Sequence, residues 1–131
     1  MIVVDSSALV AILLGEPEKE LFKEILLASD RSVISAVNAH ETATVLRLRH
    51  GATAVDKFWQ FLEVTGIEII PFDAAQVRAA AAAFSLYGKG IHAKARLNLA
   101  DCAAYALART LNAPLLFKGN DFTHTDLQAC V

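Results

Sequence analysis

Short apolar segments that alternate with longer stretches of helical periodicity constrain the fold of this chain more than any other feature. Segments of three or four residues are too short for a helix, and an apolar, partly β-branched composition is typical of buried strands. We expect four strands, at residues 2–4, 32–34, 67–70 and 115–117, with residues 127–131 as a candidate short edge strand. Because helical stretches separate them, these strands should pair in parallel through right-handed crossovers. The sequence therefore predicts the α/β class, as a three-layer α/β/α sandwich around a central parallel sheet of four to five strands.

Helix start and stop signals lie between the first two predicted strands. Ser6 and Ser7 can cap a first helix that runs through Leu14 and ends at Gly15. Pro17 suits the first turn of a second helix, where a missing backbone N–H costs nothing. The apolar face of this second helix consists of Leu21, Phe22, Ile25 and Leu26.

The remaining helices carry similar signals. Ser35 can cap a third helix that runs to about His50. Asp73 can cap an alanine-rich helix that ends near residue 87, and Asn98 can cap the last helix after a glycine-flanked loop at residues 88–96. In the fourth helix, spacings of i, i+3, i+4 and i+7 predict four core side chains: Val55, Phe58, Trp59 and Leu62.

The bulk properties of the chain indicate one domain, at residues 1–131. Hydrophobic residues make up 55% of the sequence, which argues against disorder, and no apolar run reaches the roughly 18 residues that a membrane span needs. Cys102 and Cys130 form no metal-binding or disulfide pattern, and the opening residues lack the basic region of a signal peptide. We therefore expect a cytoplasmic protein that makes no membrane contact.

Four acidic residues lie next to the predicted strands. Asp5 directly follows the first strand, and Asp121 comes shortly after the fourth. Glu41 lies in the second turn of the helix after strand two, and Asp101 lies in the first turn of the helix before strand four. Ligands bind to parallel α/β sheets at the carboxyl ends of the strands, where the strand order reverses. If strands one and four are neighbours at the sheet centre, all four carboxylates can converge on one rim.

Converging carboxylates repel one another and need a cation to neutralise them. Their hard oxygen atoms select Mg²⁺ or Mn²⁺ rather than zinc. A pair of such ions, roughly 4 Å apart, can activate water and stabilise the departing oxygen of a phosphodiester. The formal net charge of −2 counts against a nucleic-acid-binding domain, which is usually basic. A bound metal would nevertheless set the local charge at such a site.

Each acid also has a purely local explanation. Asp5 can cap the helix that follows it, and Asp101 sits three residues after Asn98, where it stabilises the helix dipole. Glu41 taken alone is a solvated helix residue, and Asp121 follows Gly-Asn in a pattern typical of turns. Only their joint placement at one predicted rim favours a catalytic role.

Four segments of the sequence form a further pattern: the opening MIVVDSSALVAIL, NAHE at residues 38–41, LNLADCAAYALA at residues 97–108 and LLFKGNDFTHTDL at residues 115–127. Together they resemble PIN-domain ribonucleases, and most closely the VapC toxins of VapBC type II toxin–antitoxin systems. The resemblance covers nearly the whole chain, in the order and spacing of the family, and the last two segments are its most specific part.

The resemblance also implies roles for individual residues. The family's acidic metal-site positions, which are catalytic, correspond to Asp5, Glu41, Asp101 and Asp121. Ser6 matches its small hydroxyl residue beside the first acid, and Asn98 matches its asparagine before the third; both would support the metal ligands. Relatives often have a second acid where this chain has Asn120, so either Asn120 or Asp121 would face the metal. Asp126 recurs in the family, and we expect it to hold the loop.

For function, the resemblance implies Mg²⁺- or Mn²⁺-dependent endonucleolytic cleavage of RNA by metal-activated water, often of structured RNA such as tRNA. It also implies a homodimer and a cognate VapB-type antitoxin, which lays a peptide into the active-site groove, commonly with an Arg side chain that reaches the acids. The alternative is a catalytically silent PIN-fold module that binds RNA or protein. Loss of an acid would favour that alternative, but all four positions are filled.

Contact with RNA phosphates requires cations near the rim. The candidates close to the predicted rim are His92, Lys94, Arg96 and Lys118. A solvated charged loop explains these residues equally well. Arg47 and Arg49 lie on the far part of the third helix, and we expect them to be ordinary surface residues.

Two other enzyme classes fit the sequence less well. A phosphatase or phosphoryl-accepting receiver of similar fold needs paired acids after the first strand, but Ser7 occupies the position of the second acid. A nicotinamide-dependent dehydrogenase needs the GxGxxG pattern after its first strand, and this chain has none there.

Overall fold

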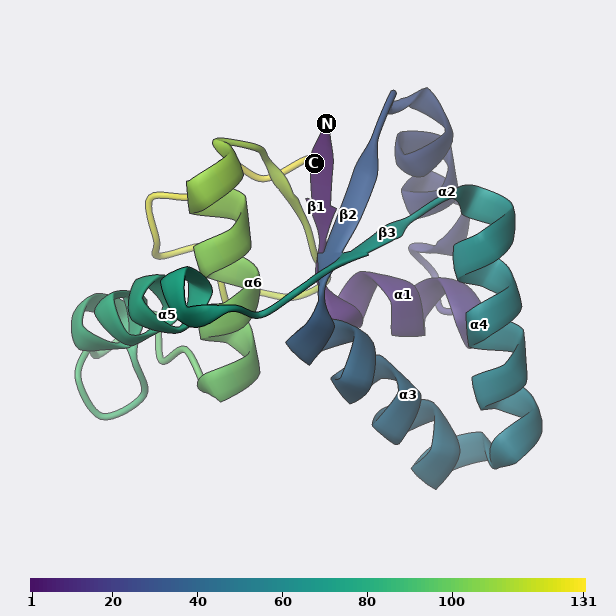
Figure 1. The fold of residues 1–131 in the computed structure, drawn as a ribbon, viewed down its shortest axis with the longest axis horizontal. Coiled ribbons are helices and arrows are strands. Elements are labelled where there is room, and N and C mark those ends of the chain that lie inside the picture. The colour runs from purple at the N-terminus through teal and green to yellow at the C-terminus, as the bar shows by residue number, and fades with distance from the viewer.

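The computed structural model describes residues 1–131 and contains four strands and six helices (Figure 1). The strands are β1 (Ile2–Val4), β2 (Ser32–Ser35), β3 (Glu68–Ile70) and β4 (Leu115–Leu116). The helices are α1 (Ser6–Leu13), α2 (Lys19–Ala28), α3 (Ala36–His50), α4 (Ala52–Thr65), α5 (Ala74–Tyr87) and α6 (Leu99–Leu111). None of these helices combines the length and hydrophobicity that a membrane crossing requires.

The four strands form one parallel sheet in the order β3-β2-β1-β4. Val3 of β1 pairs with Val33 of β2 on one side and with Leu115 of β4 on the other. The chain builds the sheet outward from β1 to β3 and then returns to the opposite side of β1, so the strand order reverses beside β1. The carboxyl ends of β1 and β4 therefore flank the position where such sheets bind ligands.

Two details of the predicted sheet are wrong. Strands β1 and β4 are neighbours, as expected, but only β1 is central, because β4 ends the sheet. Residues 127–131 form no strand. Their contact with β4 is a single parallel bridge between Leu115 and Ala129, with backbone hydrogen bonds from Leu115 to Gln128 and from Cys130 to Leu115. The bridge is isolated and does not continue into a ladder of paired residues.

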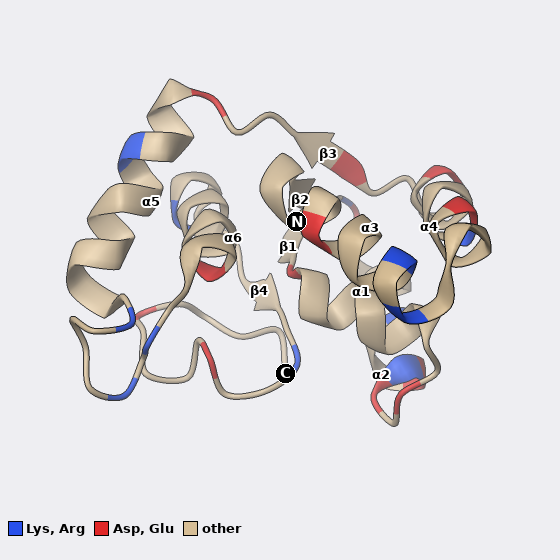
Figure 2. Cartoon of the chain, turned by 90° about the horizontal axis from the view of Figure 1, so that it is seen from below, with Lys and Arg blue, Asp and Glu red and all other residues tan.

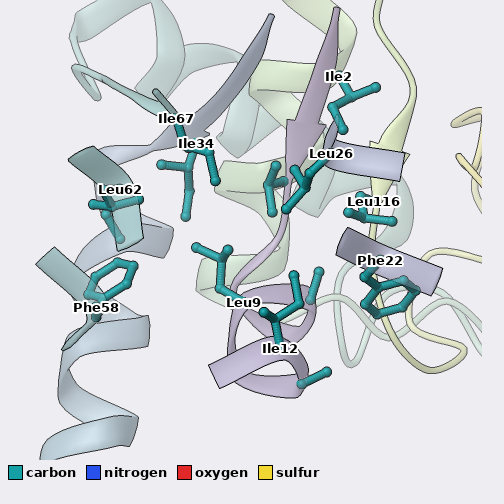
Figure 3. Close-up of a cluster of buried hydrophobic side chains, with 14 of the residues drawn as sticks. Ile2, Leu9, Ile12, Phe22, Leu26, Ile34, Phe58, Leu62, Ile67 and Leu116 are labelled. Carbon is teal, nitrogen blue, oxygen red and sulfur yellow. The ribbon is translucent and has the colours of Figure 1, made fainter. Parts of the chain in front are cut away.

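Two hydrophobic cores lie on opposite faces of the sheet, which confirms the three-layer sandwich. Side chains alternate between the faces of a strand, so Val4 enters one core and Val3 the other. The first core packs the sheet against α1 to α4 (Figure 3) and includes Leu9, Ile12, Phe22, Leu26, Ile34, Leu46, Phe58 and Leu62. The second packs it against α5 and α6 and includes Val33, Ala80, Ala83, Leu97, Ala104 and Leu107.

Two predicted helix features need correction. Helix α1 begins at Ser6, and its cap is Asp5 rather than the two serines, because the Asp5 carboxylate accepts the Ser7 N–H. Helix α2 begins only at Lys19, so Pro17 lies in the preceding turn and not in the helix. The caps of α3, α5 and α6 are those predicted: Ser35, Asp73 and Asn98.

Trp59 is the exception among the side chains expected in the core of α4. Phe58 is fully buried, but Trp59 is 44% exposed, although the two rings touch with centroids 4.9 Å apart. The helical spacing fits both residues, and only the tertiary packing shows which of them faces the sheet. Consecutive helix positions differ by about 100° around the axis, and here Phe58 faces the core while Trp59 lies at its edge.

We predict that Phe58→Ala lowers the free energy of unfolding by about 3–5 kcal/mol, because it opens a cavity in a fully buried site. Trp59→Ala, one residue along the same helix, should lower the free energy of unfolding by only about 1 kcal/mol, because much of this side chain is already exposed. Urea denaturation followed by circular dichroism measures both values, since Trp59 is the only tryptophan and its fluorescence is lost in the second variant. Equal losses in the two variants would contradict this assignment of the core.

Candidate active site

A hollow of about 410 Å³ lies at the carboxyl ends of β1 and β4, where the strand order reverses. Its wall includes all four acids singled out from the sequence, Asp5, Glu41, Asp101 and Asp121. Figure 2 shows acidic segments just after β1 and at the start of α6, on the side of the sheet where β1 ends. Other polar residues of the wall are Ser6, Ser7, Glu16, Arg49, Asn98 and Lys118.

Asp5 is the most buried of the acids, with 4% of its surface exposed. Its Oδ2 atom accepts hydrogen bonds from the backbone N–H of Ser7 (3.0 Å) and from the Ser7 hydroxyl (2.6 Å). Its Oδ1 atom is buried and has no hydrogen-bond partner within the protein. One oxygen thus caps α1 while the other is free, and an unpartnered buried carboxylate oxygen is costly unless a ligand satisfies it.

Glu41 and Asp101 are also anchored through one oxygen each. The Ser6 hydroxyl donates to Glu41 Oε1, which fixes the glutamate against the first turn of α1. The backbone N–H of Asn98 donates to Asp101 Oδ2 (2.9 Å), while Asn98 Oδ1 accepts from the Asp101 N–H (2.8 Å), so the two residues form a capping box. The second oxygen of each acid makes no hydrogen bond within the protein.

A buried asparagine ties the helices of these two acids together. Asn38 is fully buried, and its Nδ2 donates to the carbonyl of Ala100 (3.0 Å) in the first turn of α6. Asn38 precedes Glu41 by one helical turn, and Ala100 is adjacent to Asp101. This hydrogen bond therefore fixes the distance between the two carboxylate-bearing turns. We singled out Asn38 only as part of the family-like NAHE segment, with no role of its own.

The loop after β4 presents Asp121, and not Asn120, to the hollow. The carbonyl of Asn120 accepts from the N–H of Thr123 (3.2 Å) and from its hydroxyl (2.7 Å), which closes a turn. Asp126 accepts a hydrogen bond from the Tyr105 hydroxyl (2.6 Å), so it ties the end of this loop to α6. These contacts agree with the role in holding the loop that we expected for Asp126.

The electrostatics of the hollow are those of crowded acids. Burial raises the pKa of Asp5 to about 6, although the hydrogen bonds from Ser7 oppose the shift, and the charges of Glu41 and Asp121 add to it. Burial likewise raises the pKa of Asp101 to about 7, against the hydrogen bond from Asn98. The other three acids contribute further to this shift through charge repulsion. When its acids are ionised, the site therefore carries more negative charge than the nearby hydrogen-bond donors and cations balance.

The donor atoms of this site suit a hard divalent cation such as Mg²⁺ or Mn²⁺. Three acids each have one anchored and one free oxygen, and the free oxygen of Asp5 is buried. No group of three or more His, Cys, Asp or Glu side chains is already arranged to hold a metal ion. Mutual repulsion keeps ionised carboxylates apart, and a cation would reverse that force. The donor set thus fits a metal that draws the acids together.

Three of the predicted RNA-contacting residues lie away from the hollow. His92, Lys94 and Arg96 do not contribute to its wall. Instead, His92 Nδ1 accepts the backbone N–H groups of Lys94 (3.1 Å) and Ala95 (2.9 Å), which shapes the loop from within. Lys118 does reach the hollow, but its Nζ atom is paired with Glu16 at 2.7 Å and with Glu18 at 3.3 Å.

Two residues of the hollow escaped the sequence reasoning. Ser7 accepts the backbone N–H of Lys118 (3.0 Å) and donates to Asp5, so it links the β4 loop to the first acid. Arg49, which we expected to be an ordinary surface residue, belongs to the wall of the hollow. A signal for it existed, because Arg49 follows Glu41 by eight residues and so lies on the same face of α3.

Comparison with known proteins agrees with this geometry. The family model of the PIN domain matches residues 2–127. The chain is 43% identical over 129 residues to Ribonuclease VapC42 of Mycobacterium tuberculosis, covering 98% of each chain. It is 41% identical over 125 residues to Ribonuclease VapC30 of the same organism, covering 95% of each.

Solved structures share the fold at lower sequence identity. The crystal structure of Mycobacterium tuberculosis VapC20, a sarcin-ricin loop cleaving toxin, matches with a TM-score of 0.80 and 18% identity, over 97% of this chain and 96% of that one. FitAcB from Neisseria gonorrhoeae matches with a TM-score of 0.73 and 21% identity, over 98% and 96%. VapBC2 from Rickettsia felis, bound to a DNA fragment from its promoter, matches with a TM-score of 0.74 and 18% identity, over 98% and 96%.

The raised pKa of Asp5 makes the stability of the metal-free protein depend on pH. Below about pH 3, the folded and unfolded states both hold the Asp5 proton, so this group does not change stability there. Between the unfolded-state pKa near 4 and the folded-state pKa of about 6, the unfolded state has lost the proton that the folded state still holds, so stability falls as the pH rises and levels off above that range. The Asp5→Asn variant has an uncharged amide in place of this carboxyl group, so it lacks this pH dependence. We therefore predict that its free energy of unfolding, relative to wild type, rises by about 2 kcal/mol between pH 4 and pH 7.5 in EDTA.

Urea titrations at the two pH values measure this difference. Asp73→Asn is the matched control, because Asp73 also caps a helix but lies on α5, exposed and outside the hollow. An Asp5→Asn variant whose stability relative to wild type is the same at both pH values would contradict the electrostatic description of the site.

Proposed function

Because the chain belongs to the PIN-domain family and to its VapC ribonucleases, we propose that it is a metal-dependent endoribonuclease toxin of a toxin–antitoxin system. The observation that carries the proposal is the hollow itself. Asp5, Glu41, Asp101 and Asp121 come from four separate segments of the chain and line it together, and one oxygen of Asp5 is buried without a partner. A binding module without catalysis has no need to hold such repelling charges together.

Asp5, Glu41, Asp101 and Asp121 are the residues that would hold the metal, which we propose to be Mg²⁺ or Mn²⁺. When bound, the ion would favour deprotonation of an attacking water and stabilise the charge that develops on the phosphate oxygens. The protein contributes by positioning. Asp5 and Asp101 are fixed by the caps of α1 and α6, and Glu41 is fixed by Ser6, so little reorganisation is needed when substrate binds.

We propose RNA as the substrate, and structured RNA such as tRNA as its class. The hollow is open at the surface, because Asp121 and Arg49 are exposed side chains of its wall. An RNA loop or single strand, whose backbone projects outward, can reach such a site more easily than a paired helix can.

We propose a VapB-type antitoxin as the inhibiting partner. Five carboxylates line the hollow, Glu16 included, against the two cations Arg49 and Lys118. This excess of negative charge suits a peptide that brings an Arg side chain into the hollow, since a guanidinium pairs well with carboxylates. The expected homodimer stays a prediction, which light scattering on the purified chain tests.

Purified protein freed of any antitoxin should cleave labelled total RNA or a tRNA pool when Mg²⁺ or Mn²⁺ is present, and EDTA should abolish cleavage. Asp5→Asn and Asp101→Asn should each reduce the cleavage rate by at least 100-fold, because each removes a carboxylate from the metal site. Gel electrophoresis of end-labelled RNA measures the rates.

Asp73→Asn serves as the control and should cleave at the wild-type rate, since it changes a cap aspartate outside the hollow. Cleavage that survives EDTA or Asp5→Asn would show that the carboxylate–metal mechanism is wrong. Wild type that is inert on every RNA pool, like the variants, would favour the catalytically silent alternative.

A further inference from the structure

One positively charged side chain in the wall of the hollow, Arg49, forms no salt bridge with an acid. Arg49 and Lys118 are the only Lys or Arg residues in its wall. Lys118 forms salt bridges with Glu16 at 2.7 Å and Glu18 at 3.3 Å, which also raise its pKa. Arg49 takes part in none of the salt bridges or side-chain hydrogen bonds of the chain, and its side chain is exposed.

The position of Arg49 on α3 places it beside the acids. Glu41, Val45 and Arg49 follow one another at intervals of four residues, and all three belong to the wall of the hollow. They form one stripe along α3, in which Glu41 lies in the second turn and Arg49 in the last. Figure 2 shows the basic segments at the end of α3. Arg49 is therefore about two turns, or roughly 12 Å along the axis, from the Glu41 backbone.

Arg47 offers a natural comparison, since it is only two residues away on the same turn. It contributes to a different surface, between α3 and α4, together with His40, Thr44 and Asp56. Both arginines are exposed and near the carboxyl end of the same helix. They differ in which face of α3 they occupy.

An acidic hollow repels a polyanion, so a nuclease with this wall needs a cation for the RNA backbone outside the metal site. Glu41 and Arg49 line the same hollow, so an RNA strand with its cleaved phosphate at the acids would bring a neighbouring phosphate of its backbone near Arg49. A guanidinium can donate two parallel hydrogen bonds to one phosphate. We propose that Arg49 binds a phosphate of the RNA one or two nucleotides from the phosphate that is cleaved. This assignment rests on the proposed ribonuclease function.

The test compares Arg49→Ala, Arg49→Lys and Arg47→Ala with wild type on a total tRNA pool in Mg²⁺. Arg49→Ala should lower kcat/KM by about tenfold to a hundredfold, mainly through a higher KM, because it removes a contact to substrate and not to the reacting atoms. Arg49→Lys keeps the charge but loses the paired hydrogen bonds, and should fall between the two. Arg47→Ala should leave kcat/KM unchanged.

Binding gives a second readout that does not require cleavage. With Asp101→Asn as the background, fluorescence anisotropy measures affinity for labelled tRNA across a range of salt concentrations. Adding Arg49→Ala should weaken binding and reduce the slope of log affinity against log salt by about one, as loss of one phosphate contact predicts. Thermal melts of each variant confirm that it is folded.

The outcomes separate this proposal from the function on which it rests. If wild type cleaves RNA and Arg49→Ala matches Arg47→Ala in both kcat/KM and salt slope, the assignment of Arg49 is wrong and the ribonuclease stands. If wild type neither cleaves nor binds tRNA or total RNA, both proposals are overturned.

Discussion

Burial of the Asp5 carboxylate at the carboxyl end of β1 is the constraint on which the rest of the structure depends. β1 is an interior strand, and the strand order reverses beside it, so the residue that follows β1 lies where such sheets bind ligands. Asp5 ends the strand, caps α1 through one oxygen and leaves the other buried and unpartnered. The three remaining acids line the same hollow, and the charges of Glu41 and Asp121 raise the pKa of Asp5 further.

The acids of the site also do structural work. Asp5 caps α1, and Asp101 forms the capping box of α6 with Asn98. Glu41 accepts a hydrogen bond from the Ser6 hydroxyl. A carboxylate has two oxygens, so one can hold the backbone while the other stays free for a ligand. The local and the catalytic explanations that the sequence allowed for Asp5 and Asp101 are therefore compatible. Fixing an acid through a helix cap also limits its movement, so the free oxygen is the part of the side chain that can turn toward a ligand.

The sequence predicted the structure correctly where a local pattern is compatible with only one conformation. The strand-like segments, the caps Ser35, Asp73 and Asn98, and the two-faced core follow from local chemistry and periodicity. It failed where tertiary packing decides between equivalent options. Helical spacing could not tell which of Phe58 and Trp59 is buried. Nor could the sequence predict that Lys118 pairs with Glu16 and Glu18, which lie far away in the chain, while Arg49 pairs with no acid. The choice between Asn120 and Asp121 likewise depends on a turn that closes on Thr123.

If the four acids form a site for a divalent cation, calorimetric titration of Mn²⁺ into the metal-free protein at pH 7.5 will show saturable binding by wild type. Asp101→Asn and Glu41→Gln should each bind Mn²⁺ at least tenfold more weakly, and Asp73→Asn should bind it as wild type does. Binding that is absent from wild type, or equally strong in wild type and in the two hollow variants, would contradict a cation site at these acids.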